Sequence, residues 1–213
     1  MRKVKFSIFA ATGLFLLTIG TSAAQGVKKG NVLVDAYYGF PNLYTTVFKT
    51  AYANSGSEVG LKIGGVGPLG VRAEYMVADK IGVGLDIGYN NSKVSFSQES
   101  SIFNPSTGNV DPITYTYDFT TRKIGVIATF NYHFVSNDKI DAYFVFGAGY
   151  GNRTFSFKTD DPIWTKQSTT GLIPVASKIG LGFRYFFTEH IGANLAVGFG
   201  QGGVINAGVS YKL

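Results

Sequence analysis

The sequence predicts an all-β protein, an eight-stranded antiparallel up-and-down transmembrane β-barrel. Eight segments alternate between apolar residues and polar or glycine residues, which is the period of a strand with two different faces. Short and long connections between these segments also alternate along the chain. The composition agrees, with 28 Gly, 13 Tyr and 18 Phe among 213 residues and only 15% charged residues.

The first residues have the layout of a secretory signal peptide. A positive start, an apolar run over 6–19 and small residues ahead of Gln25 follow one another. The cations are Arg2, Lys3 and Lys5, and the small residues are Ser22, Ala23 and Ala24. The run is shorter than the about 20 apolar residues that span a bilayer. We therefore predict a cleaved signal peptide over 1–24 and a single barrel domain over 25–213, with an uncleaved membrane anchor as the alternative.

The predicted strands fill most of the remaining chain. In the segment 81–89, apolar residues at odd positions alternate with glycine or Asp86 at even positions. Comparable alternation marks the segments 31–40, 71–77, 123–134, 141–150, 178–187, 191–199 and 206–213. Because the second face is largely glycine with few but repeated charges, we expect an apolar wall facing lipid around a crowded polar lumen. A soluble lipocalin-like barrel, with the two faces reversed, is the alternative.

The connections between the strands alternate in length. Short turns are predicted at 78–80, 136–139 and 188–190, longer loops near 41–57, 98–111 and 158–170, and a brief fourth connection on the long side at 201–203. Short turns are typical of the periplasmic side of outer-membrane barrels, and long loops of the outer side. Because the strand count is even, both chain ends are expected on the periplasmic side.

The apolar parity switches partway along three predicted strands. Residues 81–89 are apolar at odd positions, whereas Val94 and Phe96 are even. The corresponding exceptions in the next two strands are Tyr115, Tyr117, Phe119, Phe155 and Phe157. Above a bilayer the outer face meets water, so apolar residues move to the other face, although a β-bulge also shifts parity. Because all three switches lie toward the long loops, they favour strands that protrude outside the cell.

These residues resemble the OmpA/OmpX-type small outer-membrane barrels, the outer membrane protein β-barrel domain family. The resemblance covers about residues 27–213 and is most specific at 67–75, at 79–86 and in the terminal strand. It implies an integral outer-membrane protein, a monomer in contact with lipids and lipopolysaccharide, with a scaffolding or adhesive role toward an extracellular protein or surface ligand. The long middle strands are similar to the OmpX-like subtype, whose protruding sheet is thought to bind partners. The chain ends in Leu213, where such barrels usually carry an aromatic residue that assists the barrel-assembly machinery.

Six charged residues fall on the predicted lumen face, namely Arg72, Glu74, Asp86, Lys123, Asp141 and Arg184. An eight-stranded barrel has an interior just wide enough for side chains, and unpaired charges there are costly. We therefore predict a paired ion network that plugs the lumen. The alternative function is a narrow pore for ions or small solutes.

Two groups of aromatic residues are candidates for contacts outside the lumen. The residues near the short turns and in the last strand are Tyr75, Tyr132, Tyr185 and Tyr211. We expect them to form a girdle at the periplasmic membrane boundary, with rings in the apolar zone and hydroxyls in water. The residues in the long connections are Tyr44, Phe48, Tyr52, Phe103 and Trp164. These either pack against their own loops or form a contact surface, since aromatic residues dominate recognition hot spots.

The sequence argues against several functional classes. His133 and His190 lie 57 positions apart and Cys is absent, so we expect no metal site and no cofactor. Asn131 and His133 are similar to the histidine segment of lipid A deacylase barrels, which makes a lipid-modifying enzyme the third and least favoured reading. We predict no enzymatic activity, because a Ser–His–acid triad needs a mutual geometry that the sequence does not supply. The net charge falls from +6 to +3 without the three signal cations, and in the absence of a basic stripe no nucleic-acid partner is expected.

Overall fold

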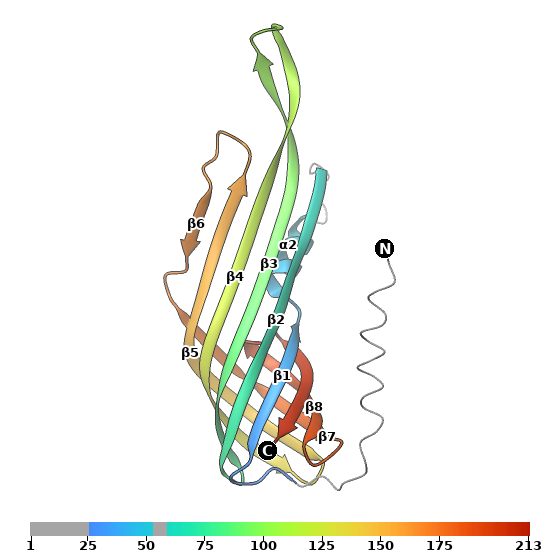
Figure 1. Ribbon diagram of the computed structural model, residues 1–213, viewed down its shortest axis with the longest axis vertical. Helices are drawn as coiled ribbons and strands as arrows, with labels where there is room; N and C mark the ends of the chain where they lie inside the picture. The colour runs from blue at the N-terminus through green and yellow to red at the C-terminus, as the bar shows by residue number, and fades with distance from the viewer. Residues whose placement is uncertain (1–25, 53–58) are drawn as a thin grey trace.

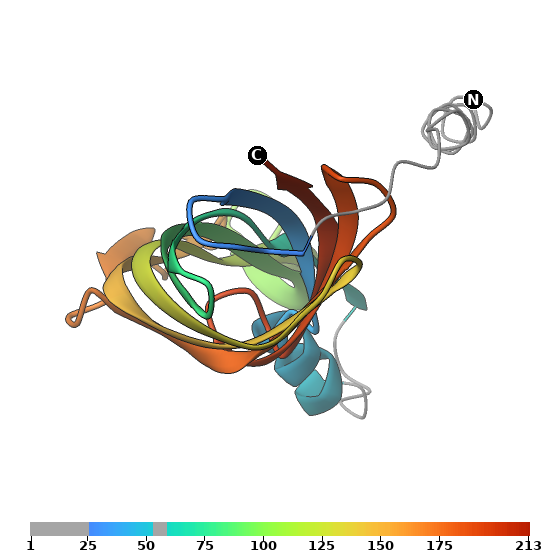
Figure 2. The same ribbon diagram turned by 90° about the horizontal axis from the view of Figure 1, so that it is seen from below.

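An antiparallel ring of eight strands forms the body of the molecule in the computed structural model (Figure 1 and Figure 2). The structure describes residues 26–52 and 59–213, so the predicted signal peptide lies outside the described residues. The ring consists of β1 Val32–Phe40, β2 Val59–Ala78, β3 Ile81–Asn104, β4 Asn109–Ser136, β5 Ile140–Thr159, β7 Val175–Phe186, β8 Ile191–Gly200 and β9 Ile205–Lys212. Pairing of β4 with β5 and of β9 with β1 closes the ring. The predicted eight-stranded antiparallel barrel is confirmed.

The outer wall of the ring is apolar and its interior is polar. The outward-facing Leu85 and Ile124 expose 54% and 52% of their surface, whereas the inward-facing Asp86 exposes 0%. In a soluble barrel the apolar side chains fill the interior and the polar ones face water. The observed faces are the opposite, so the lipocalin-like alternative is wrong.

Two of the expected long loops contain regular structure of their own. The helix α2, Leu43–Tyr52, follows β1 within the expected loop 41–57. The short strand β6, Gln167–Thr170, lies within the expected loop 158–170 and pairs with β5. In the part of the chain that the structure describes, no helix has the length and hydropathy needed to cross a membrane.

The prediction of a loop near 98–111 is wrong, because two paired strands occupy most of this segment. β3 continues to Asn104 and β4 begins at Asn109, and the two strands stay in register up to these residues. The remaining residues turn the chain, with Gly108 at φ +73° and its amide donating to the carbonyl of Asn104 at 2.9 Å. The polar residues that suggested a loop instead lie on a solvent-exposed ribbon, in which both faces meet water.

The protruding parts of β3 and β4 keep the facing of the barrel below them. Their register runs without a shift from the pair Ile81–Tyr132 to the pair Asn104–Asn109, so no β-bulge lies between these pairs. Even-numbered residues of β3 therefore stay on the lumen-side face, where Val94 is only 2% exposed. The parity switch therefore reflects a change in what the outer face of the sheet contacts, and not a change of facing. Figure 1 shows the hairpin rising far above the ring.

Residues 26–31 cross the opening of the ring at its short-turn end (Figure 2). The carbonyl of Val27 accepts a hydrogen bond of 2.9 Å from the hydroxyl of Ser136 at the end of β4. The side chain of Val27 belongs to a buried apolar cluster with Leu33, Met76 and Phe186. This segment, which we call the strap, covers one end of the lumen.

Candidate functional site

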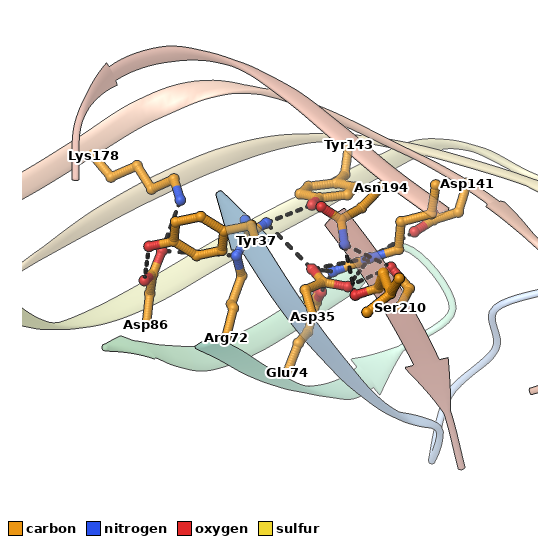
Figure 3. A network of polar contacts seen from close by, with 12 residues as sticks. Asp35, Tyr37, Arg72, Glu74, Asp86, Asp141, Tyr143, Lys178, Asn194 and Ser210 are labelled. Carbon is orange, nitrogen blue, oxygen red and sulfur yellow. Dashed lines mark hydrogen bonds and ion pairs between the residues drawn. The ribbon is translucent and has the colours of Figure 1, made fainter. Parts of the chain in front are cut away.

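A network of charged side chains fills the middle of the lumen (Figure 3). The network has two centres, a lower one nearer the short-turn end and an upper one nearer the mouth. The lower centre is Arg184 on β7, whose guanidinium donates to three carboxylates from other strands. The distances are 2.8 Å to Asp35, 2.7 Å to Glu74 and 2.8 Å to Asp141, and all four side chains are buried. Charge-assisted hydrogen bonds of this length are among the strong ones. Arg184 therefore ties β1, β2 and β5 to β7 across the barrel.

The upper centre of the network is the carboxylate of Asp86 on β3. It accepts hydrogen bonds from Lys178 at 2.7 Å, from the hydroxyl of Tyr37 at 2.7 Å and from the amide of Gln201 at 2.9 Å. Arg72 lies between the two centres, with nitrogens 3.7 Å from Asp86 and 3.5 Å from Asp35. The network is therefore continuous from the lower centre to the upper one.

His133 on β4 extends the lower centre of this network toward the strap. Its Nδ1 lies 2.6 Å from Asp141 and its Nε2 lies 2.8 Å from Glu74. Carboxylate oxygens only accept hydrogen bonds, so this geometry requires a hydrogen on both ring nitrogens, as in the imidazolium form. The four buried acids Asp35, Glu74, Asp86 and Asp141 are then balanced by Arg72, His133, Lys178 and Arg184.

Glycines on the inner wall provide the space that the network occupies. A Cβ placed on Gly182 would overlap the ring of Tyr143. This side chain is fully buried, its hydroxyl accepts a hydrogen bond from Arg72, and its ring lies against the guanidinium of Arg184. A Cβ on Gly88 or on Gly125 would instead overlap the side chain of Gln201. Glycine on the inner wall therefore makes room for long side chains inside a narrow barrel.

The structure brings together five of the six residues that we expected in the lumen. Lys123 is the exception: it lies half-buried near the mouth and forms no ion pair with any residue that the structure describes. Our list of network residues omitted Asp35, Tyr37, His133, Tyr143 and Lys178. Strand parity already places Asp35 and Lys178 on the glycine-rich face, so parity was the signal that could have found them.

The four girdle tyrosines lie near the short-turn end of the ring and face outward. Three of them stand directly opposite an isoleucine that begins the neighbouring strand, in the pairs Tyr132–Ile81, Tyr185–Ile140 and Tyr211–Ile191. Tyr75 instead stands between Val32 and Val83. All four residues are between 38% and 49% exposed, and their role as a girdle at the membrane boundary stays a prediction.

The aromatic residues of the long connections do not form one cluster. Phe103 is 62% exposed near the end of the β3–β4 hairpin, and Trp164 is 60% exposed between β5 and β6. Tyr44 on α2 covers the barrel mouth, with its ring 4.7 Å from the guanidinium of Arg153. Phe48 and Tyr52 belong to the same helix, and their side chains lie outside the described residues.

A row of rings covers the lumen-side face of the protruding sheet. Phe96 stacks on Tyr117 at a centroid distance of 5.2 Å, and Phe119 lies 4.7 Å from Phe157. Trp164 stands edge-on to Phe157, at 85°, and closes one end of the row. These five residues, which we call the aromatic face, line an open groove of about 470 Å³. The sequence parity had placed Phe96, Tyr117, Phe119 and Phe157 on one face, but it did not place Trp164 beside them.

The position of Trp164 depends on a hydrogen bond of the aromatic face. The hydroxyl of Tyr117 donates to Asp161 at 2.6 Å, and the same side chain accepts from the amide of Ile163 at 2.9 Å. This hydrogen bond raises the pKa of Tyr117 to about 12, so the hydroxyl stays protonated and donating at neutral pH.

Replacing Tyr117 with Phe is therefore expected to loosen the turn that carries Trp164. Because Trp164 is the single tryptophan of the chain, its fluorescence reports this turn alone. We expect a red shift of its emission and stronger quenching by acrylamide. The matched control is Tyr115→Phe, on the same strand and face, which should leave both signals unchanged. Equal quenching in the wild type and in Tyr117→Phe would contradict this role of the hydroxyl.

Comparisons with known proteins relate the chain to outer-membrane barrels. The model of the family described as outer membrane protein beta-barrel domain matches residues 11–212. One similar solved structure is the N-terminal β-barrel domain of Pseudomonas aeruginosa OprF, at 14% identity, with a TM-score of 0.42 over 89% of this chain and 100% of that chain. Another is Ail of Yersinia pestis in complex with the heparin analogue sucrose octasulfate, at 11% identity, with a TM-score of 0.34 over 87% of this chain and 99% of that chain. No curated protein sequence matches the chain.

Proposed function

The chain belongs to the outer membrane protein beta-barrel domain family, and on this premise we propose that it is a non-enzymatic surface-binding protein of the outer membrane. In this proposal the plugged barrel is a scaffold that anchors the protruding sheet. The contact surface is the aromatic face together with the end of the β3–β4 hairpin. The partner is an extracellular protein or a surface ligand of another cell.

The observation that carries this proposal is the amount of apolar surface above the ring. Beyond Ser97 on β3 and Tyr117 on β4, no described strand pairs with the hairpin, so both of its edges are open toward the described part of the chain. We call this part, residues 98–115, the tip ribbon. Its exposed apolar side chains include Ile102, Phe103 and Val110. Open strand edges accept partner strands by β-augmentation, and exposed apolar residues that no membrane requires mark interaction surfaces.

The lumen network supports a scaffold over a pore. Its charged side chains pair with one another across the interior, and the strap covers the short-turn end. An ion passing through would have to displace pairs such as Arg184 with Asp35, which are buried and hydrogen-bonded. We therefore expect the purified protein to conduct ions poorly in planar bilayers.

The other assignments remain predictions of this proposal. They comprise cleavage of residues 1–24, a mature domain over 25–213, a monomeric state, contact with lipopolysaccharide and recognition of the last strand by the barrel-assembly machinery. Tyr211, rather than Leu213, is the aromatic residue near the end of that strand. Absence of the signal from the mature amino terminus, read by mass spectrometry, tests the first of them.

Removing the tip ribbon tests the function. Ser97 and Thr116 stand opposite one another, so replacing residues 98–115 with a two-residue Asn-Gly turn keeps the register below. We expect bacteria displaying this variant to lose most of their binding to cultured epithelial cells and to immobilised extracellular-matrix protein. The barrel itself should remain folded, as judged by the different gel mobility of boiled and unboiled samples.

The matched control is Lys93→Gln, which changes an exposed residue on the opposite face of the same hairpin and should leave binding unchanged. Binding that survives removal of the ribbon in a folded barrel would argue against the tip ribbon as part of the contact surface. If the intact protein also gave stable, selective single-channel currents, the pore would replace it.

A further inference from the structure

Three residues form a row across the lumen-side face at the mouth of the barrel. Lys123 on β4 stands directly opposite Asn90 on β3 and directly opposite Arg153 on β5. All three side chains are half-buried. They lie above the lumen network, and the ring of Tyr44 lies over Arg153 at 4.7 Å. The row therefore belongs neither to the lumen network nor to the aromatic face.

The row places two positive charges side by side without a negative one. Like charges directly opposite on neighbouring strands destabilise a sheet. Lys123, Arg153, Asn90 and Tyr44 line a cavity of about 80 Å³, and none of the described residues around it is an aspartate or a glutamate. Elsewhere in the lumen each described arginine or lysine of the network has a carboxylate within 4.0 Å. Among the residues that the structure describes, the mouth therefore concentrates positive charge without a compensating carboxylate.

Arg153 also has a buried donor without a partner. Its Nη1 donates to the hydroxyl of Tyr44, but its Nε is shielded from solvent and has no hydrogen-bond acceptor among the described residues. A buried N–H group left unsatisfied is costly, and more so on a charged side chain. An acceptor that carries negative charge and reaches both Arg153 and Lys123 would remove both penalties.

From this row we infer an anion-binding site at the mouth of the barrel, which takes a tetrahedral oxyanion such as a phosphate or sulfate group. The guanidinium edge and the ammonium group are the side chains that proteins use for such groups. The cavity has room for several water molecules, and hence for a group with four oxygens. The paired charges of the lumen network close the interior below the row, so the group enters from the outer side, beside Tyr44 on α2. This inference stands independently of the proposed adhesive role.

The site is tested by titrating inorganic phosphate into the folded full-length mature protein in detergent micelles at constant ionic strength. Isothermal titration calorimetry and the ³¹P linewidth of phosphate both report the binding. We expect saturable binding at one site. Lys123→Gln and Arg153→Gln should each weaken it by about tenfold, the effect of one charged hydrogen bond. The matched control is Arg122→Gln, because Arg122 is the exposed neighbour of Lys123 on the opposite face.

Each variant is first checked for the gel mobility of a folded barrel, and Lys123→Gln alone decides the matter if Arg153→Gln does not fold. No saturable phosphate binding by the wild type overturns the site. Equal weakening in Arg122→Gln also overturns it, because binding would then follow net charge alone. A second arm distinguishes the sources of the group. If lipopolysaccharide in lipid nanodiscs competes with phosphate, the group belongs to the protein's own membrane, whereas unchanged binding assigns it to a soluble or foreign ligand.

Discussion

Replacing Arg184 with Met is expected to lower the free energy of unfolding by about 3–5 kcal/mol, the effect of breaking a buried ion pair. The guanidinium contacts Asp35, Glu74 and Asp141 within 2.8 Å, and every one of these side chains is fully buried. Met fills a similar volume but cannot donate. Three carboxylates would then share the remaining cations, and the acid side of the lumen network would exceed the basic side.

Urea titration in lipid vesicles measures this loss, with folded and unfolded fractions read from gel mobility without boiling. The matched control is Arg122→Met, which removes the same charge from an exposed position and should change stability little. A loss no larger than that of the control would mean that water already solvates the lumen charges. In that case the network would not act as a plug.

Replacing Gly182 with Val is expected to destabilise the barrel by about 1–3 kcal/mol or to prevent its assembly, as overpacking of a filled interior does. A Cβ at this position would overlap the ring of Tyr143. That ring cannot move aside easily, because its hydroxyl lies 2.5 Å from Arg72 and the guanidinium of Arg184 stands 4.3 Å from its centre. The effect therefore originates inside the lumen and not in the strand itself.

If the destabilisation comes from overlap with the Tyr143 ring, a smaller residue at position 143 should relieve it. Tyr143→Leu in the Gly182→Val background should restore part of the stability, measured by the same urea titration. The matched control is Gly64→Val. Gly64 also lies in a strand, β2, but a Cβ at this position meets nothing within 4 Å. If Tyr143→Leu worsens the defect as much as it does alone, the two residues do not compete for space and the argument fails.

The sequence by itself determined the barrel, because the signal it carries is local. Strand alternation has a period of two, and a chain with a repeated apolar face and a glycine-rich polar face has few other ways to satisfy its backbone in lipid. The same parity assigned Arg72, Glu74 and Asp86 to the lumen and Phe96 and Tyr117 to the lumen-side face of the protruding sheet. It did so without knowledge of any contact, since facing follows from position along one strand.

The tertiary structure alone decided which charges meet. Arg184 and Asp35 are 149 positions apart in the chain, and their contact depends on the stagger of strands around the closed ring. The pairing of β4 with β5 likewise places Lys123 above the network, directly opposite Arg153. The polar residues at 98–111 also led to the wrong prediction of a loop, because a ribbon with water on both faces needs no apolar alternation. Facing is a property of each strand, whereas partners across a barrel are a property of its closure, and only the folded ring contains that information.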